Sequence, residues 1–104
     1  APELDFAGGQ RVLALVLVRA PGWPTGPGDP EFALEYAEAA VDAFPDYPPN
    51  QLVLGETLLE NGRRDEAKKR LERGVELARA SRADGHPEAA DWISQAEEIL
   101  AKIR

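Results

Sequence analysis

Few residues of this chain have the types and the spacing that catalysis or metal binding requires. The one histidine, His86, stands in the turn 84–87 (DGHP), where it could form half of a metal site with Asp84. The same position suits a solvated turn residue or a helix cap, which is the interpretation we favour. Ser81 and Ser94 have no other candidate base, and a nucleophilic serine needs one within hydrogen-bonding reach. We therefore expect no catalytic residue, no bound metal and no cofactor.

Two further patterns could bind a charged ligand. The segment 26–29 (GPGD) precedes a predicted helix, as a phosphate-binding loop does. However, Pro27 and Pro30 lack the amide hydrogens that such a loop uses, and no Lys-Ser/Thr pair follows. Carboxylates at helical spacing could attract a divalent cation or a basic partner, although we favour a solvated helix face. They are Glu31, Glu35, Glu38 and Asp42.

The composition excludes several classes of protein. The 104 residues carry 19 acidic and 12 basic side chains, a net charge of −7, whereas a nucleic-acid-binding protein needs a basic face. The longest apolar run, residues 12–18, is much shorter than the roughly 20 residues that span a bilayer. Cysteine is absent, which excludes disulfides and thiolate metal sites. We expect a soluble domain of the cytoplasm or periplasm, with no nucleic acid partner and no membrane span.

Proline and glycine divide the chain into segments. Seven of the ten residues in 21–30 are Pro or Gly, a composition that excludes a helix there. Apolar residues recur at helical spacing in the segments 30–44, 49–61, 63–80 and 87–103. Asp29 and Pro30 suit the start of a helix, and Gly62 suits the end of one.

The segment 10–20 is ambiguous. Its Val and Leu residues suit a buried strand, but no second strand is available to pair with it. We therefore predict a helix that is apolar on all sides. Such a helix is normally buried on all sides, and only one helix follows it closely. A preceding helix of a longer protein or a second copy of the chain could cover it. We expect the chain to self-associate through this segment, forming a homo-oligomer.

The strongest internal signal is self-similarity at a period of 34 residues. Identical residues recur at this distance at Gly28 and Gly62, Ala33 and Ala67, Glu38 and Glu72, and Val41 and Val75. A unit of this length made of two short antiparallel helices resembles the tetratricopeptide repeat. The small and large positions of that family are matched by Leu13-Ala14, Leu17, Ala33, Ala37, Pro45, Leu54-Gly55, Leu58, Ala67, Leu71, Trp92, Ala96 and Ile99.

The resemblance covers about residues 10–103 and has departures. Gln51 replaces the usual Trp of the family, and Arg79 replaces its closing Pro. Seven extra residues lie in the Pro-Gly stretch, and about seven more lie around 81–86. The linker and the second helix also look like tetratricopeptide proteins of bacterial envelopes, some of them lipoproteins. That likeness implies a bacterial origin and an association with the envelope.

The family resemblance implies an all-α solenoid of about five helices in a single domain over residues 1–104. It would contain the helix pairs 10–44 and 49–80 and a closing helix 87–103. The first helix of each pair would line a concave groove that binds a peptide or helix of a partner protein. The expected lining is Arg11, Val12, Leu15, Val18, Arg19, Leu52, Val53, Glu56, Leu59 and Glu60. The small residues expected at helix crossings are Ala14, Ala33, Gly55, Ala67 and Ala96.

The same resemblance implies a non-catalytic protein-interaction scaffold. Some members clamp a C-terminal carboxylate with Lys and Asn, but Leu52 and Glu56 stand at those positions, so we do not expect this ligand here. The alternatives are a structural helical segment of a longer protein and, more remotely, a metal-dependent enzyme that uses His86. Two aromatic residues, Trp23 and Tyr47, stand among prolines, where each could pack over the helices or be exposed for recognition.

Overall fold

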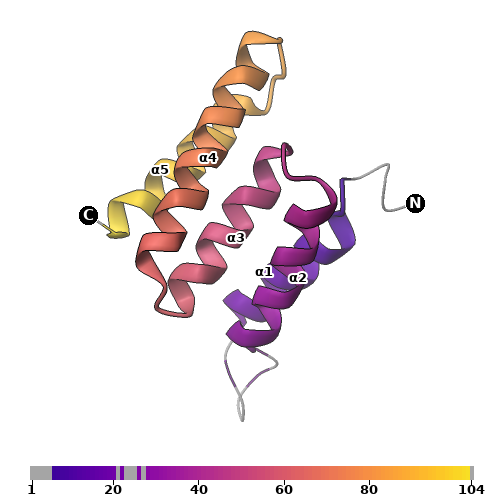
Figure 1. The fold of residues 1–104 in the computed structure, drawn as a ribbon, viewed down its shortest axis with the longest axis vertical. Helices are drawn as coiled ribbons and strands as arrows, with labels where there is room; N and C mark the ends of the chain where they lie inside the picture. Colours follow the sequence, from indigo (N-terminus) through magenta and orange to yellow (C-terminus); the bar gives the residue numbers. More distant parts are fainter. Residues whose placement is uncertain (1–5, 21, 23–25, 27, 104) are drawn as a thin grey trace.

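Five helices build the chain in a computed structural model, which describes residues 6–20, 22, 26 and 28–103. They are α1 (Gly8–Arg19), α2 (Pro30–Ala43), α3 (Pro48–Glu60), α4 (Arg64–Ala83) and α5 (Ala89–Ile103) (Figure 1). All five predicted helices are confirmed, and each bound lies within three residues of its expected place. Within the described residues, the β-structure is an isolated bridge between Gly22 and Gly28. The all-α prediction is therefore confirmed.

Local signals in the sequence account for the helix ends. The Asp29 carboxylate accepts a hydrogen bond from the Phe32 amide at 3.1 Å, which caps the start of α2, and Pro30 takes the first helical position. Gly62 follows α3 with a φ of 76°, a left-handed conformation that favours glycine over residues with a Cβ. The ambiguous segment 10–20 is helical, as predicted.

The helices pack as two consecutive pairs, α1 with α2 and α3 with α4, and α5 closes the row against α4 (Figure 1). The first helices of the pairs also contact one another, α1 with α3 and α3 with α5. Helix α3 therefore contacts all four other helices. Its central position explains why nine of its 13 residues are buried.

Two hydrophobic clusters form the core. One joins α3, α4 and α5 around Leu71 and Trp92, and the other joins α1, α2 and α3 around Val53 and Leu58. Several small residues are buried between the helices. All five that the sequence placed at crossings are buried, namely Ala14, Ala33, Gly55, Ala67 and Ala96. In the described part of the chain, no helix is long and apolar enough to cross a membrane.

Candidate functional site

A groove of about 570 Å³ lies along α1, α3 and α5, on the side where the first helices of the repeats meet. Its walls are lined by Arg19, Glu56, Leu59, Glu60, Gln95, Glu98, Ile99 and Lys102. Four of the ten residues that we expected to line the groove thus come together in one hollow. They are Arg19, Glu56, Leu59 and Glu60. The α5 residues complete the groove: the last helix was expected at one end of the lining, but none of its residues was named.

A bidentate ion pair bridges α1 and α3 at this groove. Arg19 donates from Nε to Glu56 Oε2 at 2.8 Å and from Nη2 to Glu56 Oε1 at 2.7 Å. The hydrogen bond to Glu56 raises the pKa of Arg19, against an opposing effect of burial. Because the Arg19 side chain is 62% exposed, solvent screens the pair, and its contribution to stability is small. Its main consequence is to fix the positions of both charges at the groove wall.

The charges of the groove wall favour a basic ligand. Three carboxylates, Glu56, Glu60 and Glu98, face two cations, Arg19 and Lys102, and Arg19 is already paired with Glu56. The half-buried side chains of Leu59 and Ile99 provide apolar surface between these charges. A segment with an apolar side chain next to a basic one matches this combination.

Three residues expected in the groove lie in the core instead. Leu52 is 4% exposed, Val53 is 6% exposed and Val18 is 9% exposed, so their assignment to an open groove was wrong. Because α3 contacts all four other helices, most of its apolar positions pack against a neighbouring helix. Leu52 joins the cluster around Leu71, whereas Val53 packs in the cluster that includes Ala14.

The remaining three expected groove residues lie elsewhere on α1. Arg11 donates a hydrogen bond from Nη1 to the side chain of Asn50 at 2.9 Å, near the start of α1, and does not line the groove. Leu15 is half-buried against the N-terminal core cluster. Val12 is 56% exposed.

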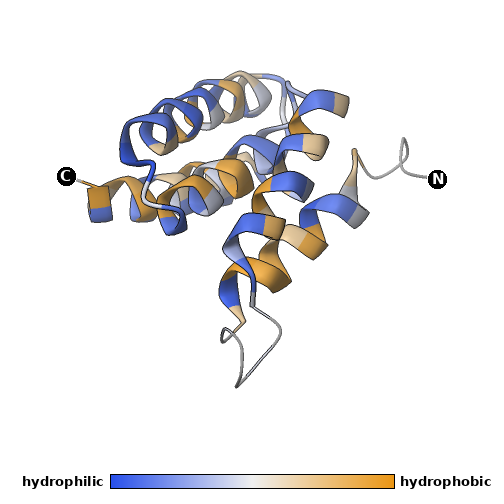
Figure 2. Cartoon of the chain, turned by 60° about the horizontal axis from the view of Figure 1, so that its bottom comes forward, coloured by the Kyte–Doolittle hydropathy of each residue, from blue (hydrophilic) through white to orange (hydrophobic). Residues whose placement is uncertain are grey.

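An apolar face of α1 is open to solvent. In the described residues, the exposed large hydrophobic side chains all belong to α1, the short segment before it or α2. They are Phe6, Val12, Leu13, Val16 and Phe32. Figure 2 shows hydrophobic residues along the two helices that the grey loop joins. We expected α1 to be apolar on all sides. One of its apolar sides is exposed, and none of the described residues covers it.

The equivalent face of α3, which the repeat identifies, can be compared with this exposed face of α1. The alignment of Leu13-Ala14 with Leu54-Gly55 relates α1 to α3 by 41 positions. On α3, the counterparts of Val12, Leu13 and Val16 are 6%, 3% and 0% exposed. They are Val53, Leu54 and Thr57. The α3 face packs against the preceding helix pair, whereas the equivalent face of α1 is open.

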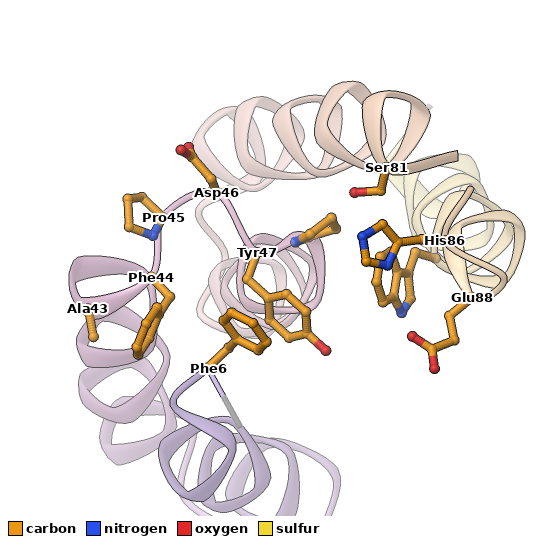
Figure 3. Close-up of a pocket in the computed structure, with 11 residues that line it drawn as sticks. Phe6, Ala43, Phe44, Pro45, Asp46, Tyr47, Ser81, His86 and Glu88 are labelled. Carbon is orange, nitrogen blue, oxygen red and sulfur yellow. The ribbon is translucent and has the colours of Figure 1, made fainter. Parts of the chain in front are cut away.

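A second pocket, of about 470 Å³, opens where α3 and α5 begin (Figure 3). Four aromatic rings line it, those of Phe6, Phe44, Tyr47 and Trp92. Tyr47 is half-buried and forms part of this wall, so it is both packed and accessible. Sequence reasoning singled out Tyr47 but not the cluster, because its members come from segments far apart in the chain.

Of the other chemical candidates, His86 and Ser81 line this aromatic pocket together with Glu88. His86 and Asp84 are exposed, and no group of three or more His, Asp or Glu residues able to hold a metal occurs in the described part of the chain. The carboxylates of the α2 stripe, Glu31, Glu35, Glu38 and Asp42, are all solvent-accessible. The expectation for Trp23 concerns a side chain outside the described residues.

Comparisons with known proteins agree with this architecture. The family model described as Tetratricopeptide repeat matches residues 26–87, which span α2, α3 and α4. No curated protein matches the chain. The matched region covers more than half of the 104 residues and includes the 34-residue period and the small residues at the crossing of α3 and α4. The chain therefore belongs to the tetratricopeptide repeat family.

Proposed function

We propose that this chain is a non-catalytic protein-interaction module that holds a peptide or helix of a partner in the groove between α1, α3 and α5. The observation that supports the proposal is the meeting of Arg19, Glu56, Leu59 and Glu60 with the α5 wall in one hollow. Tetratricopeptide repeats generally act as interaction scaffolds, and their stacked units create extended concave surfaces. The groove's volume of about 570 Å³ falls within the range of roughly 300–1,000 Å³ that is typical of ligand-binding pockets.

The charges and apolar surface of the groove determine the ligand we expect. An apolar side chain would pack on Leu59 and Ile99, and a neighbouring Lys or Arg would approach Glu60 and Glu98. Glu56 is already paired with Arg19, which leaves Glu60 and Glu98 as the carboxylates open to a ligand. Residues 20–62 contain eight acidic side chains and no Lys or Arg, and this local negative charge also favours a basic ligand.

A random peptide library displayed on phage tests the groove. We expect selection on the intact chain to yield peptides that pair an apolar residue with a basic one. Glu60→Lys is expected to weaken the selected peptides at least tenfold, because a carboxylate facing a basic residue becomes a like charge. Glu72→Lys, an exposed residue of α4 away from the groove, is the matched control. Equal weakening by both variants, measured by titration calorimetry, would contradict the groove assignment.

The open face of α1 supports a second proposed function, self-association. Val12, Leu13 and Val16 present apolar surface, and the α3 counterparts of the first two, Val53 and Leu54, are buried in the core. A second copy of the chain is the occupant we propose, seated face to face about a two-fold axis. A head-to-tail filament is disfavoured, because α5 exposes no large hydrophobic side chain among its described residues and so offers the open face of α1 no apolar partner.

Solution mass by size exclusion with light scattering tests self-association. We expect the chain to be a dimer at high concentration and Val16→Glu to be a monomer, because a buried unpaired carboxylate opposes docking. Ser94→Glu, at an exposed position of α5, should remain a dimer. A chain that stays monomeric across the concentration series would overturn this proposal. If peptide selection also fails, a structural segment of a longer protein becomes the better interpretation.

A further inference from the structure

The aromatic pocket is separate from the groove. It is lined by Phe6, Ala43, Phe44, Pro45, Asp46, Tyr47, Pro48, Ser81, His86, Glu88 and Trp92, none of which lines the groove. Tyr47 directly precedes α3, whereas Leu59 lies near its end. At 1.5 Å per residue, the two positions are about 18 Å apart along the helix. A ligand of the pocket would therefore occupy a different edge of the solenoid.

A continuous set of rings forms one wall of the pocket. The Phe6 ring stacks on Tyr47 with a centroid distance of 4.5 Å and an interplanar angle of 19°. Phe44 meets Phe6 edge to face at 5.5 Å, and Trp92 meets Tyr47 edge to face at 5.7 Å. Trp92 is only 9% exposed, which anchors this wall in the core. The packing of the rings against one another and against the core therefore holds the aromatic wall in a fixed position for a ligand.

The opposite side of the pocket is polar and acidic. Figure 3 shows the Tyr47 hydroxyl pointing across the hollow toward the side on which His86 and Glu88 lie. The lining contains two carboxylates, Glu88 on this side and Asp46 beside Pro45 on the other, and includes no Lys or Arg among the described residues. Asp46 has one cationic neighbour, Arg73 at 3.6 Å, but both side chains are largely solvated, so the pair is weak.

One ring of this pocket, that of Tyr47, already accepts a cation from within the chain, at a position outside the pocket lining. The guanidinium carbon of Arg11 lies 5.1 Å from the centroid of the Tyr47 ring. This distance is within the 6 Å or so over which a cation is attracted to a ring face. Aromatic rings together with carboxylates are the combination that binds an ammonium or guanidinium group.

We propose that this pocket binds the basic side chain, Lys or Arg, of an extended segment of another protein. The alkyl part of that side chain would lie along Pro45 and the aromatic wall, and its charged end would meet Glu88 on the far side. This site goes beyond the groove proposed above, since it shares no lining residue with it. A small quaternary amine has related chemistry, and the experiment below separates it from a peptide side chain.

The experiment is an NMR titration that uses the indole N–H of Trp92 as the reporter. The chain has two tryptophans, so Trp23→Phe leaves Trp92 alone. The probes are N-acetyl-arginine amide, its uncharged isostere N-acetyl-citrulline amide, and choline. We expect a saturable shift with the arginine probe, at least tenfold weaker binding of the citrulline probe, and weaker binding of choline than of arginine.

Variants then test the role of the carboxylates. Glu88→Gln is expected to weaken the arginine probe at least threefold, whereas Glu97→Gln, at an exposed α5 position outside the pocket, should leave it unchanged. Glu88 is exposed, so its replacement should leave the remaining spectrum intact. The absence of a saturable shift, equal binding of citrulline, no effect of Glu88→Gln, or tighter binding of choline would each overturn the proposal. Because no groove residue changes, these outcomes are independent of the groove experiment.

Discussion

Replacing Asn50 with alanine is expected to lower the free energy of unfolding by about 3 kcal/mol, because its two N–H groups, shared among three carbonyls, and its Oδ1 make hydrogen bonds worth about 1 kcal/mol each. The Asn50 side chain is fully buried. Its Nδ2 donates to the carbonyls of Phe6 at 2.9 Å and of Ala40 and Phe44 at 3.2 Å. Its Oδ1 accepts from Arg11 Nη1 at 2.9 Å. The side chain therefore ties together α2, α3 and the residues at the start of α1.

The measurement is thermal and urea unfolding of the variant beside a matched control. A loss of this size should lower the Tm by roughly 10 °C or more in a domain of about 100 residues. Asn61, at the end of the same helix, donates Nδ2 to the carbonyls of Pro30 at 2.9 Å and Thr57 at 2.8 Å, but it is partly exposed. Because water can replace these bonds, Asn61→Ala should cost about 1 kcal/mol or less. Equal losses from both variants would show that Asn50 does not join the helices.

The importance of Asn50 could not be predicted from the sequence, whereas the helices could. Helix ends are set by local chemistry, such as the Asp29 cap and the left-handed Gly62, and local chemistry is visible in a single sequence. A buried polar residue has no such signature. Asn50 follows two prolines, a position equally suited to a solvated first turn. Its partners Phe6 and Ala40 are 44 and 10 residues away, and only the packed structure brings them together.

The groove was predicted in part, and the errors have one physical cause. Arg19, Glu56 and Glu60, which we expected at the groove, line the hollow, because charged side chains avoid the core whichever helices surround them. The type of an apolar residue does not predict in the same way whether it is buried or lines a groove, when its helix contacts several others. Leu52 and Val53 belong to different clusters of the core, and Leu59, about two turns further on, reaches the groove. The difference lies in which neighbour covers each position, and that is a property of the tertiary structure.

Gly55 is where we expect the second large effect, because its position leaves no room for a side chain between α3 and α4. A Cβ built on Gly55 would lie 2.6 Å from Leu71 Cγ and 2.7 Å from Leu71 Cδ2. Leu71 is fully buried, so the surrounding core opposes its displacement. Gly55→Val should therefore destabilise the fold by about 3 kcal/mol, a loss typical of severe overpacking, even though glycine itself is a poor helix former. Chemical denaturation of the variant gives this number directly.

A glycine without neighbours provides the control. Gly9 lies in α1, and a Cβ added to it would meet no atom within 4 Å. Gly9→Ala should therefore stabilise the chain by up to about 1 kcal/mol through helix propensity alone. If Gly9→Ala destabilised the chain, the effect of substituting a helical glycine could not be attributed to contact with a neighbour such as Leu71.

A double-mutant cycle separates the contact between the two helices from other effects of the substitution. Leu71→Ala alone should cost about 2–5 kcal/mol, because it leaves a cavity in the core around Trp92. In the Gly55→Val/Leu71→Ala double variant, the added methyl groups enter the space that Leu71 Cγ and Cδ2 have left. The combined loss should therefore fall short of the sum of the single losses by at least about 1 kcal/mol. Strict additivity would mean that Gly55 is required for the backbone of α3 rather than for its approach to α4, and the assignment of small residues to helix crossings would then fail at this position.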